Sequence, residues 1–336
     1  MKKSNTLFLS TTTKRIIPMV FFVFLLLSSS FVLGAARTAS VSGLWSSTAT
    51  WGGAAIPTSA DAVTINSGIT VTVDMAAQCA SLTFAAVAAS STVTISGTNS
   101  LAIIGLLSMP RPSSGFLCTV NVNAGTLTCG TLTMSATTSG RNDVFNITSG
   151  SATISGNATT GTTGCIFNFT GAGSLFFGGT ISSTPTLTTF SGSTVSYTSA
   201  SSQTVLAGSY SNLTLSGAGA KTLNGASSVS GNLTLTSGIL TTTTTNLLSI
   251  TNTTSTAIFG GSTTSYISGP LKWTLPASLA SGSNYNFPVG KGGVYLPFSL
   301  NSPTTGTGTV TAQVEAFNVS AAGTYDASLT STSTTE

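Results

Sequence analysis

The side chains that could carry out acid–base chemistry are few in this chain of 336 residues. It contains no histidine and only six Asp and Glu residues, which excludes a Ser-His-Asp triad, an imidazole base and a histidine-bound metal. Glycoside hydrolysis normally uses two carboxyl groups about 5–10 Å apart, and Asp61 and Asp74 could approach each other on neighbouring turns of the fold. However, Asp61 follows a Pro-Thr-Ser turn, where Asp bonds local backbone amides, and Asp74 ends an expected strand. We therefore expect structural roles for both.

Lyase chemistry would need a Lys, Arg or Tyr base beside a cation that neutralises the substrate carboxylate. Four candidates fall in one region without an acidic or basic companion set: Lys272, Lys291, Tyr285 and Tyr295. Arg141 and Asp143 are expected to form a surface ion pair across a turn. The sequence has no Asp-rich calcium loop, Walker loop or dinucleotide fingerprint. It predicts no enzyme and no catalytic, cofactor-binding or metal residue, and it leaves the binding residues unknown; a β-helix polysaccharide lyase or hydrolase is the alternative.

The chain has four cysteines: Cys79, Cys118, Cys129 and Cys165. They form no CxxC pair, so a zinc or redox site is not expected. Two interpretations stay open. The four could form disulfides, which persist in exported proteins, with Cys118 and Cys129 facing each other across a hairpin turn. Alternatively, all four are small buried residues inside a stack of strands.

The net charge of +4 and the pI near 9.0 come from the N-terminal segment. Four basic residues precede an apolar run that ends at Gly34: Lys2, Lys3, Lys14 and Arg15. Basic residues, an apolar run and then small residues are typical of a signal peptide, which we place at residues 1–36 with a cut before Arg37. An uncleaved membrane anchor is the alternative, because the run approaches the length of a membrane span. The rest of the chain has zero net charge, which excludes a nucleic-acid partner that needs a basic face.

The elements after Arg37 are short strands, because apolar residues alternate with Thr, Ser or Asn at period two. Asn212-Leu213-Thr214-Leu215 returns twenty residues later as Asn232-Leu233-Thr234-Leu235. A period near twenty suits one turn of a β-solenoid, and on the order of eleven turns are expected at about 4.8 Å each. The predicted fold is therefore all-β, a right-handed parallel β-helix or β-solenoid with a C-terminal β-sandwich-like cap. Tandem antiparallel β-sandwiches are the alternative.

The organisation follows from shifts in composition along the chain. We expect an N-terminal β-helix module at residues 37–110, solenoid repeats at 111–265, a C-terminal β cap at 266–320, and a polar tail or linker at 321–336. Three tryptophans fall near the two ends of the expected solenoid: Trp45, Trp51 and Trp273. Buried, they would cover the ends of the stack. Exposed, they would stack on sugar rings.

Two segments resemble secreted bacterial surface proteins. Residues 43–73 resemble the N-terminal module of many secreted β-helix proteins, with these features: Trp45, Trp51-Gly52-Gly53, Pro57, Asp61-Ala62-Val63-Thr64-Ile65 and Ile69-Thr70-Val71-Thr72-Val73-Asp74. Residues 210–298 resemble a segment of large Ser/Thr-rich, adhesin-like proteins of Bacteroidetes-type bacteria, with these features: Tyr210-Ser211-Asn212-Leu213-Thr214-Leu215, Lys221-Thr222-Leu223, Gly260-Gly261-Ser262, Tyr266-Ile267-Ser268-Gly269-Pro270-Leu271 and Phe287-Pro288-Val289-Gly290. The resemblance implies a structural or adhesive role. The chain departs from these proteins in one respect: they commonly end in a C-terminal sorting domain, and nothing after Glu315 resembles one.

The sequence predicts a secreted or cell-surface structural and adhesive protein that presents a Thr/Ser-rich solenoid face. Its partners would be glycans or other surface proteins, with no nucleic acid and no membrane contact except through the leader before cleavage. A third possibility is ice binding, because Thr ladders on β-solenoids can bind ice. The relevant Thr-x-Thr triplets are Thr70-Val71-Thr72, Thr92-Val93-Thr94, Thr126-Leu127-Thr128, Thr131-Leu132-Thr133 and Thr186-Leu187-Thr188. However, exposed strand positions favour Thr in any case, and these triplets are irregularly spaced.

Overall fold

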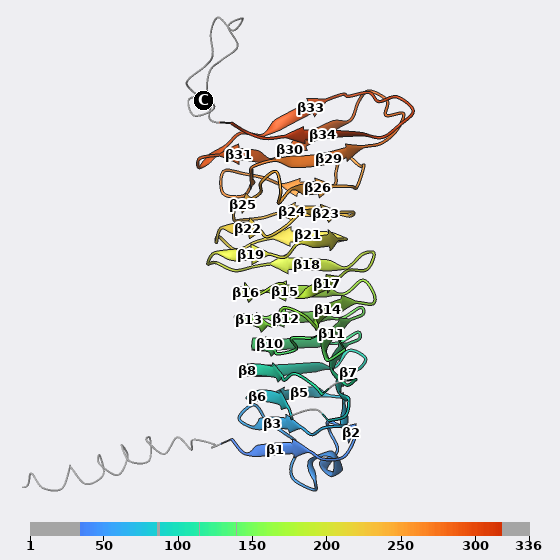
Figure 1. The fold of residues 1–336 in the computed structure, drawn as a ribbon, viewed down its shortest axis with the longest axis vertical. Helices are drawn as coiled ribbons and strands as arrows, with labels where there is room; N and C mark the ends of the chain where they lie inside the picture. Colours follow the sequence, from blue (N-terminus) through green and yellow to red (C-terminus); the bar gives the residue numbers. More distant parts are fainter. Residues whose placement is uncertain (1–33, 86–87, 114, 139, 318–336) are drawn as a thin grey trace, which may run out of the picture. The chain divides into compact units, whose positions relative to one another are not determined.

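The computed structural model describes residues 34–85, 88–113, 115–138 and 140–317, and these residues form an all-β fold. Successive turns of the chain stack strand upon strand (Figure 1). Parallel pairing between the turns builds a β-solenoid of about eleven turns, which confirms the predicted fold. Within the described residues the only helical segment is a single 3-10 turn, η2 (Thr48–Trp51). No helix in these ranges is long and apolar enough to cross a membrane.

Sheet A runs the length of the stack. Its main path contains β1 (Ala36–Ala39), β3 (Ala62–Ile65), β6 (Ser81–Phe84), β8 (Ser100–Met109), β10 (Thr126–Met134), β12 (Ser151–Ile154), β15 (Ser174–Phe177), β18 (Thr194–Tyr197), β21 (Asn212–Leu215), β24 (Leu233–Leu235) and β27 (Ile258–Gly260). Three strands lie beside this path: β5 (Ala76–Cys79), β13 (Ala158–Thr160) and β16 (Ile181–Ser182).

The sheets beside sheet A differ between the two halves of the solenoid. Sheet B belongs to the first half and contains β2 (Gly43–Leu44), β4 (Thr70–Val73), β7 (Ser91–Ile95), β9 (Leu117–Val122), β11 (Asn142–Ile147), β14 (Cys165–Phe169) and β17 (Thr186–Thr188). Sheets C and D replace it in the second half. Sheet C begins with β19 (Gln203–Val205), β22 (Lys221–Leu223), β25 (Leu240–Thr241) and β28 (Ile267–Ser268), and sheet D with β20 (Gly208–Tyr210), β23 (Ser227–Val229), β26 (Leu248–Ile250) and β29 (Leu271–Leu275).

Antiparallel strands follow the last parallel turns, in agreement with the predicted β cap of the fold. They are β30 (Asn284–Phe287), β32 (Val294–Tyr295), β33 (Phe298–Asn301) and β34 (Val310–Val314), together with β31 (Val289–Lys291), which also pairs in parallel with β28. Strand β34 pairs with β29, β33 with β30, and β32 with β31. A covered last turn matters because an open parallel edge would expose unpaired backbone groups.

The explicit sequence repeat is a repeat of the structure. Leu213, Thr214 and Leu215 pair residue by residue with Leu233, Thr234 and Leu235 in the next turn. The length of a turn varies elsewhere: Val195 pairs with Leu213, eighteen residues later, whereas Val93 pairs with Val120, twenty-seven residues later. The extra residues lie in the corners, so the register of the strands is kept. The turn at Asn66 connects β3 to β4, which lie in different sheets, and so forms a corner of the solenoid.

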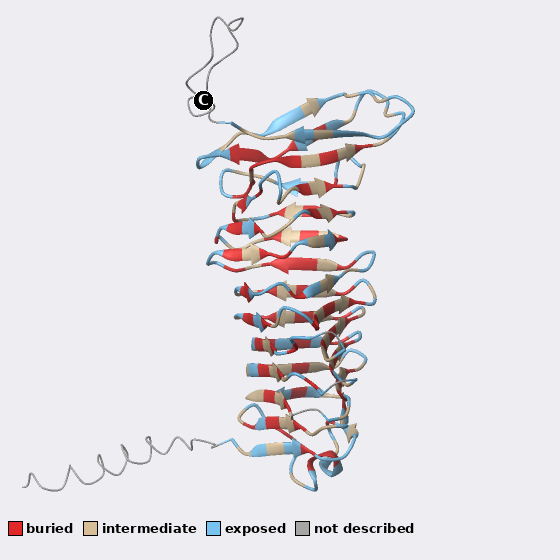
Figure 2. Cartoon of the chain, in the orientation of Figure 1, coloured by how far each residue is buried: buried red, intermediate tan, exposed pale blue. Residues whose placement is uncertain are grey.

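Stacked apolar residues form the interior of the solenoid. In sheet A, Val63, Leu82, Leu107 and Leu132 pair in sequence on four turns, and all are buried. Along most strands of the parallel turns, buried positions alternate with exposed or half-buried ones (Figure 2). Each fully buried Leu stabilises the fold by about 1.5–3 kcal/mol relative to an exposed one, so a long single column of such residues holds the turns together.

Two parts of the predicted organisation cannot be compared with the structure. Nearly all of the expected signal peptide, at residues 1–33, lies outside the described residues, and so does the expected tail at 321–336.

Candidate functional site

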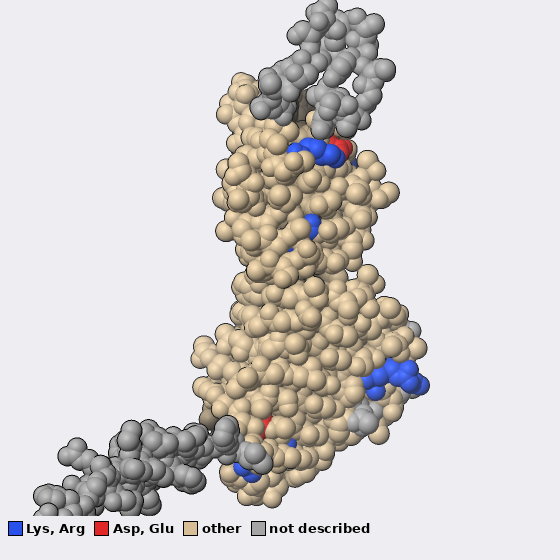
Figure 3. Space-filling model, turned by 90° about the vertical axis from the view of Figure 1, so that its left-hand side faces the viewer, with Lys and Arg blue, Asp and Glu red and all other residues tan. Residues whose placement is uncertain are grey.

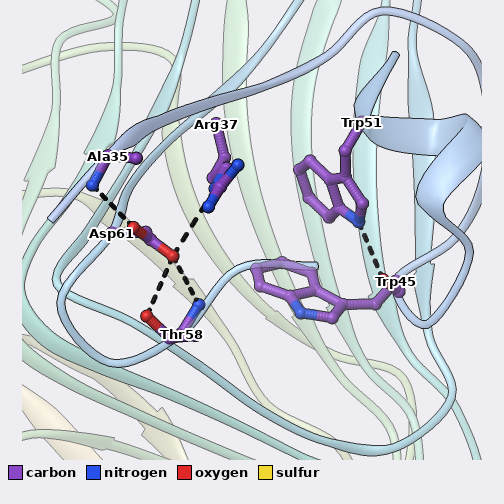
Figure 4. A network of polar contacts seen from close by, with 6 residues as sticks. All are labelled: Ala35, Arg37, Trp45, Trp51, Thr58 and Asp61. Carbon is purple, nitrogen blue, oxygen red and sulfur yellow. Dashed lines mark hydrogen bonds and ion pairs between the residues drawn. The ribbon is translucent and has the colours of Figure 1, made fainter. Parts of the chain in front are cut away.

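Asp61 is the centre of a polar cluster at the start of the solenoid (Figure 4). The side chain is 4% exposed. Its Oδ1 accepts a hydrogen bond from the backbone N–H of Ala35 at 2.6 Å, and its Oδ2 accepts from the N–H and hydroxyl of Thr58 at 2.8 and 2.9 Å. The Thr58 amide lowers the pKa of Asp61, more than burial raises it. The expected bonds to local backbone amides are confirmed, and both oxygens are occupied.

Asp74 also has a structural role. Its oxygens accept hydrogen bonds from the N–H of Ser46 at 3.1 Å and from the Ser46 hydroxyl at 2.6 Å. Partial burial raises the pKa of Asp74, but the bonds from Ser46 bring it below its usual value. Asp61 and Asp74 are thus each hydrogen-bonded to partners of their own, Thr58 and Ala35 for Asp61 and Ser46 for Asp74.

The predicted surface pair of Arg141 and Asp143 is wrong. Asp143 points into the solenoid and is fully buried. Its Oδ2 accepts from the N–H of Ala136 at 2.8 Å, while Oδ1 has no hydrogen-bond partner among the described residues. Burial raises the pKa of Asp143 to about 7, only partly offset by the backbone amides. The one ion pair within the described ranges joins Arg37 Nε to Asp61 Oδ2 at 3.6 Å.

The residues considered as lyase bases do not form a site. Tyr285 is buried and donates its hydroxyl to the carbonyl of Thr253 at 2.9 Å. The ring of Tyr295 packs against Tyr266, and burial raises the pKa of both Tyr285 and Tyr295. Lys272 lies on the outer side of β29. None of these groups has an acidic partner within the described residues.

All three tryptophans are buried, so they do not form sugar-stacking platforms. Trp45 and Trp51 meet edge to face with ring centroids 5.0 Å apart, and Trp51 Nε1 donates to the carbonyl of Trp45 at 2.8 Å (Figure 4). Trp273 packs against Tyr285 and Phe287 and donates to the carbonyl of Asn252 at 2.8 Å. The aromatic clusters support the expectation that these residues cover the ends of the stack.

The cysteines are buried and unbridged. The proposed hairpin pairing of Cys118 with Cys129 is wrong, because β9 and β10 belong to different sheets. Cys79 and Cys129 both pair with Ile103, and Cys118 and Cys165 both pair with Asp143, so a turn of the solenoid separates the members of each pair. The interpretation as small buried residues is the one that the structure supports. No group of three His, Cys, Asp or Glu side chains suited to a metal occurs in the described part of the chain.

The outer face of sheet A carries an aligned column of hydroxyl side chains, which we call the hydroxyl ladder. Its members pair in direct register on successive strands: Thr38, Thr64, Thr83, Ser108, Thr133, Thr159 and Ser182. All are exposed or half-buried. Neighbouring strands lie about 4.8 Å apart, so the ladder presents hydroxyl groups at a regular short spacing.

Sheet B carries two outward columns of its own. The Thr-x-Thr triplets at 70–72 and 92–94 pair residue by residue, and 186–188 ends the same sheet. The strands in the middle of sheet B carry Asn121, Asn146 and Asn168 in place of Thr. The side-chain amide of Asn146 donates to Oδ1 of Asn121 at 2.9 Å, and that of Asn168 donates to Oδ1 of Asn146 at 2.8 Å. Val144 and Ile166 interrupt the neighbouring column. The other two triplets lie elsewhere, both in β10 of sheet A.

The surface around these columns is nearly uncharged. The face drawn in Figure 3 carries only a few charged groups, with wide areas between them that hold no Lys, Arg, Asp or Glu. The hydroxyl ladder itself contains no charged residue. The alternating Thr residues are visible in the sequence, but their alignment across turns is not, because turns of different length hide the register.

One further buried group was not anticipated from the sequence. Lys221, on β22, is fully buried and its ammonium group donates to three backbone carbonyls: Ser199 at 2.9 Å, Gly219 at 2.8 Å and Gly217 at 3.3 Å. Burial lowers the pKa of Lys221. This arrangement satisfies the cation with backbone groups and places no free amine at the surface.

Comparison of the chain with models of protein families, with curated proteins and with solved structures finds no match.

Proposed function

We propose that this chain is an exported, non-catalytic surface protein whose solenoid is a structural rod with an adhesive face. The observation that carries the proposal is the hydroxyl ladder: seven aligned Ser and Thr side chains on one uncharged sheet face. From Thr38 to Thr159, these side chains form no hydrogen bond to other described side chains or to the described backbone, so their hydroxyls are available to a ligand.

The partner that fits such a face is a neutral glycan. A charged ligand would need opposite charges to offset its desolvation, and the ladder has none. Repeated hydroxyls along a rigid sheet suit repeated sugars along a chain, and many weak contacts add up when they are linked. The placement of the carboxylates supports a role without turnover, because Asp61 and Asp74 are bound to local partners and Asp143 is buried.

The test is binding and turnover measured in the same samples. Purified protein is incubated with neutral and acidic polysaccharides, with bound protein measured by sedimentation and polymer length by size-exclusion chromatography. The proposal expects retention on neutral polymers without shortening. Shortening of any polymer would instead support the lyase or hydrolase alternative. Binding only to other surface proteins would replace the glycan as the partner.

Ice binding is a second candidate, favoured by the direct register of the two Thr-x-Thr triplets at 70–72 and 92–94. The regular array is short, because Asn side chains that bond to one another replace Thr on the next turns. Thermal hysteresis and ice-crystal shaping test this candidate, and their loss in Thr72→Val and Thr94→Val variants would place the activity on sheet B.

A further inference from the structure

We propose that the mature chain begins at Ala35, after hydrolysis of the Gly34–Ala35 peptide bond, and that the carboxylate of Asp61 holds the new α-ammonium group. The inference rests on the proposed export of the chain, since a signal peptidase would make the cut. It changes the position expected from the sequence, which was the bond before Arg37. The bond before Arg37 has the small residues Gly34 and Ala36 at the −3 and −1 positions, whereas the Gly34–Ala35 bond has Val32 at −3 and the small residue Gly34 at −1.

The first support is the contact between Ala35 and Asp61. The backbone nitrogen of Ala35 lies 2.6 Å from Oδ1 and is the one hydrogen-bond donor to that oxygen among the described residues. Oδ2 is occupied by Thr58. Because the acceptor is a carboxylate, the bond is charge-assisted already with a backbone amide, and an α-ammonium group at Ala35 would add a positive charge on the donor at the same place.

The second support is the charge around the carboxylate. Asp61 is 4% exposed, and a buried carboxylate is costly unless it is paired and hydrogen-bonded. The nearest cation is Arg37, whose Nε lies 3.6 Å away and forms no hydrogen bond within the described residues. An ammonium group on Ala35 would supply the close partner that Arg37 does not. Ala35 is half-buried, so its remaining N–H groups can reach water.

The third support is where backbone pairing begins. The carbonyl of Ala35 accepts a hydrogen bond from the N–H of Ala62 at 3.1 Å, and β1 follows immediately. Gly34 is exposed but lies close against the backbone of Ala60. Within the described residues, Ala35 is the first whose backbone forms hydrogen bonds to the rest of the fold. A cut before Arg37 would remove both of its bonds and shorten β1.

The chemical step is an ordinary peptide hydrolysis by a peptidase of the export pathway. The C–N bond between Gly34 and Ala35 breaks, and water supplies OH to the Gly34 carbonyl carbon and hydrogen to the Ala35 nitrogen. The leader leaves with a carboxylate on Gly34. The Ala35 amine takes up a proton below its pKa, which is about 8 for an ordinary α-amino group, and then faces Asp61.

The position of the cut is tested by N-terminal sequencing and intact mass of the full-length chain after expression in a secreting bacterium. The expected product begins at Ala35. A product that begins at Arg37, or at any other residue after the apolar run, overturns this inference and leaves export intact. A chain that keeps Met1 and stays with the cells contradicts export itself, so the two failures are distinguishable.

The Asp61 contact is tested by the reactivity of the α-amine toward an acetylating reagent at pH 7, read by peptide mass. The carboxylate should raise the pKa of the amine, and one pKa unit reduces the reactive neutral form about tenfold. We expect the amine of the Asp61→Asn variant to react about tenfold faster than that of the unchanged protein. Equal rates would overturn the assignment.

Two variants make this comparison specific. Asp74→Asn removes a carboxylate from a different cluster and should leave the rate unchanged. Arg37→Gln keeps the Asp61 carboxylate and should keep the slow rate, which preserves the test if Asp61→Asn does not fold. A fast rate in Arg37→Gln would mean that the guanidinium, and not the Asp61 carboxylate, controls the environment of the amine, and would overturn the assignment.

Discussion

Each half of the solenoid holds a completely buried Asp or Lys side chain, Asp143 in the first half and Lys221 in the second, and the two are accommodated differently. In the first half, built from sheets A and B, Asp143 points inward with one oxygen bound to the Ala136 amide and the other without a partner among the described residues. In the second half, built from sheets A, C and D, Lys221 donates to three carbonyls. The cation is fully accommodated by backbone groups and the anion is not.

The difference follows from how parallel turns use their backbone. Within the sheets, N–H and C=O groups pair between neighbouring turns, so only corners have groups to spare. The carbonyls that receive Lys221 come from corner residues, and one of them, Gly217, has a positive φ of 76° that turns the chain sharply. A corner can therefore bind a buried ammonium group without any acidic side chain. Asp143 receives too few amides for an equal result, so burial favours its neutral form.

The largest expected effect concerns the reactivity of the four cysteine thiols, all of which lie in the first half of the solenoid. Burial raises the pKa of Cys79 and Cys129 to about 12, that of Cys165 to about 11, and that of Cys118 further. Each pKa unit reduces the reactive thiolate about tenfold. We expect a thiol reagent at pH 8 to label the folded protein at least about a hundredfold more slowly than the denatured protein, with Cys165 labelled first.

Intact mass with and without reduction completes that experiment. We expect four free thiols and no change of mass on reduction. A disulfide between any two of these cysteines would contradict the register of the first half.

The next effect is the loss of the buried cation in the second half. Lys221→Met removes the ammonium donor from three carbonyls, of which that of Ser199 still accepts from the N–H of Gly219 at 3.3 Å, and each unsatisfied buried group costs about 1–3 kcal/mol. We expect the variant to lose about 3 kcal/mol of stability, seen as faster hydrogen exchange in β19 and β22. Lys272→Met, on the outer side of β29, is the matched control and should change stability by less than about 0.5 kcal/mol. Equal losses of stability in the two variants would contradict the account in which backbone carbonyls stabilise the buried ammonium group of Lys221.

Removing the charge of Asp143 should raise the stability of the protein at high pH, whereas removing the charge of Lys221 should lower stability. The folded pKa of Asp143, about 7, lies above the value of 3.8 for an ordinary Asp, so its contribution to stability is complete below about pH 4 and is lost as the pH rises through 7. That change is about 2–4 kcal/mol. Asp143→Asn should therefore be more stable than the unchanged protein at pH 8 by about 1–3 kcal/mol, measured by thermal unfolding.

The control for this pH dependence is Asp74→Asn, in which Asp143 is unchanged. This variant should keep the decline in stability between pH 4 and pH 7. If the decline persists in Asp143→Asn, another group causes it, and the contrast between the two buried charges fails.

The smallest effect concerns the outer surface of the first half. Asn146→Ala breaks the two amide bonds of the Asn ladder, at 2.9 and 2.8 Å. Exposed bonds of this kind contribute about 0.5–1 kcal/mol, so a modest fall in the melting temperature is expected. Thr119→Ala, in the adjoining column, should have less effect. A larger loss for Thr119 would show that β-branched packing, not the amide ladder, stabilises sheet B.

Much of the fold could be predicted from the alternation of apolar and hydroxyl residues and from one repeat. The copies at Leu213 and Leu233 are in register because that turn has the same length as the sequence period. Where corners are longer or shorter, similarity along the sequence is lost although the strands still align. This is why the register of the hydroxyl ladder could not be predicted, although the sequence predicts a Thr/Ser-rich solenoid face.

The placement of Asp143 was missed for a different reason. It shares the inward face with Phe145 and Ile147, two and four residues later, and all three are buried. The alternation of inward and outward residues along this strand therefore predicts that Asp143 is buried. We expected a surface pair with Arg141 instead, because burying a carboxylate is costly. Lys221 likewise shares the inward face of its strand with Leu223, two residues later. In both cases the strand pattern outweighs the preference of a charged side chain for water.

The most direct test of the adhesive face compares two matched triple variants in polysaccharide binding. One carries Thr64→Val, Thr83→Val and Thr133→Val in the hydroxyl ladder of sheet A. The other carries Thr72→Val, Thr92→Val and Thr94→Val on sheet B. Valine keeps the β-branched shape that strands favour, so both should fold.

We expect the sheet A variant to bind neutral polysaccharide at least about tenfold more weakly, a change of about 1.4 kcal/mol, and the sheet B variant to bind as the unchanged protein does. Equal binding by all three proteins, with circular dichroism showing intact β structure, would contradict the proposal that the hydroxyl ladder is the contact surface.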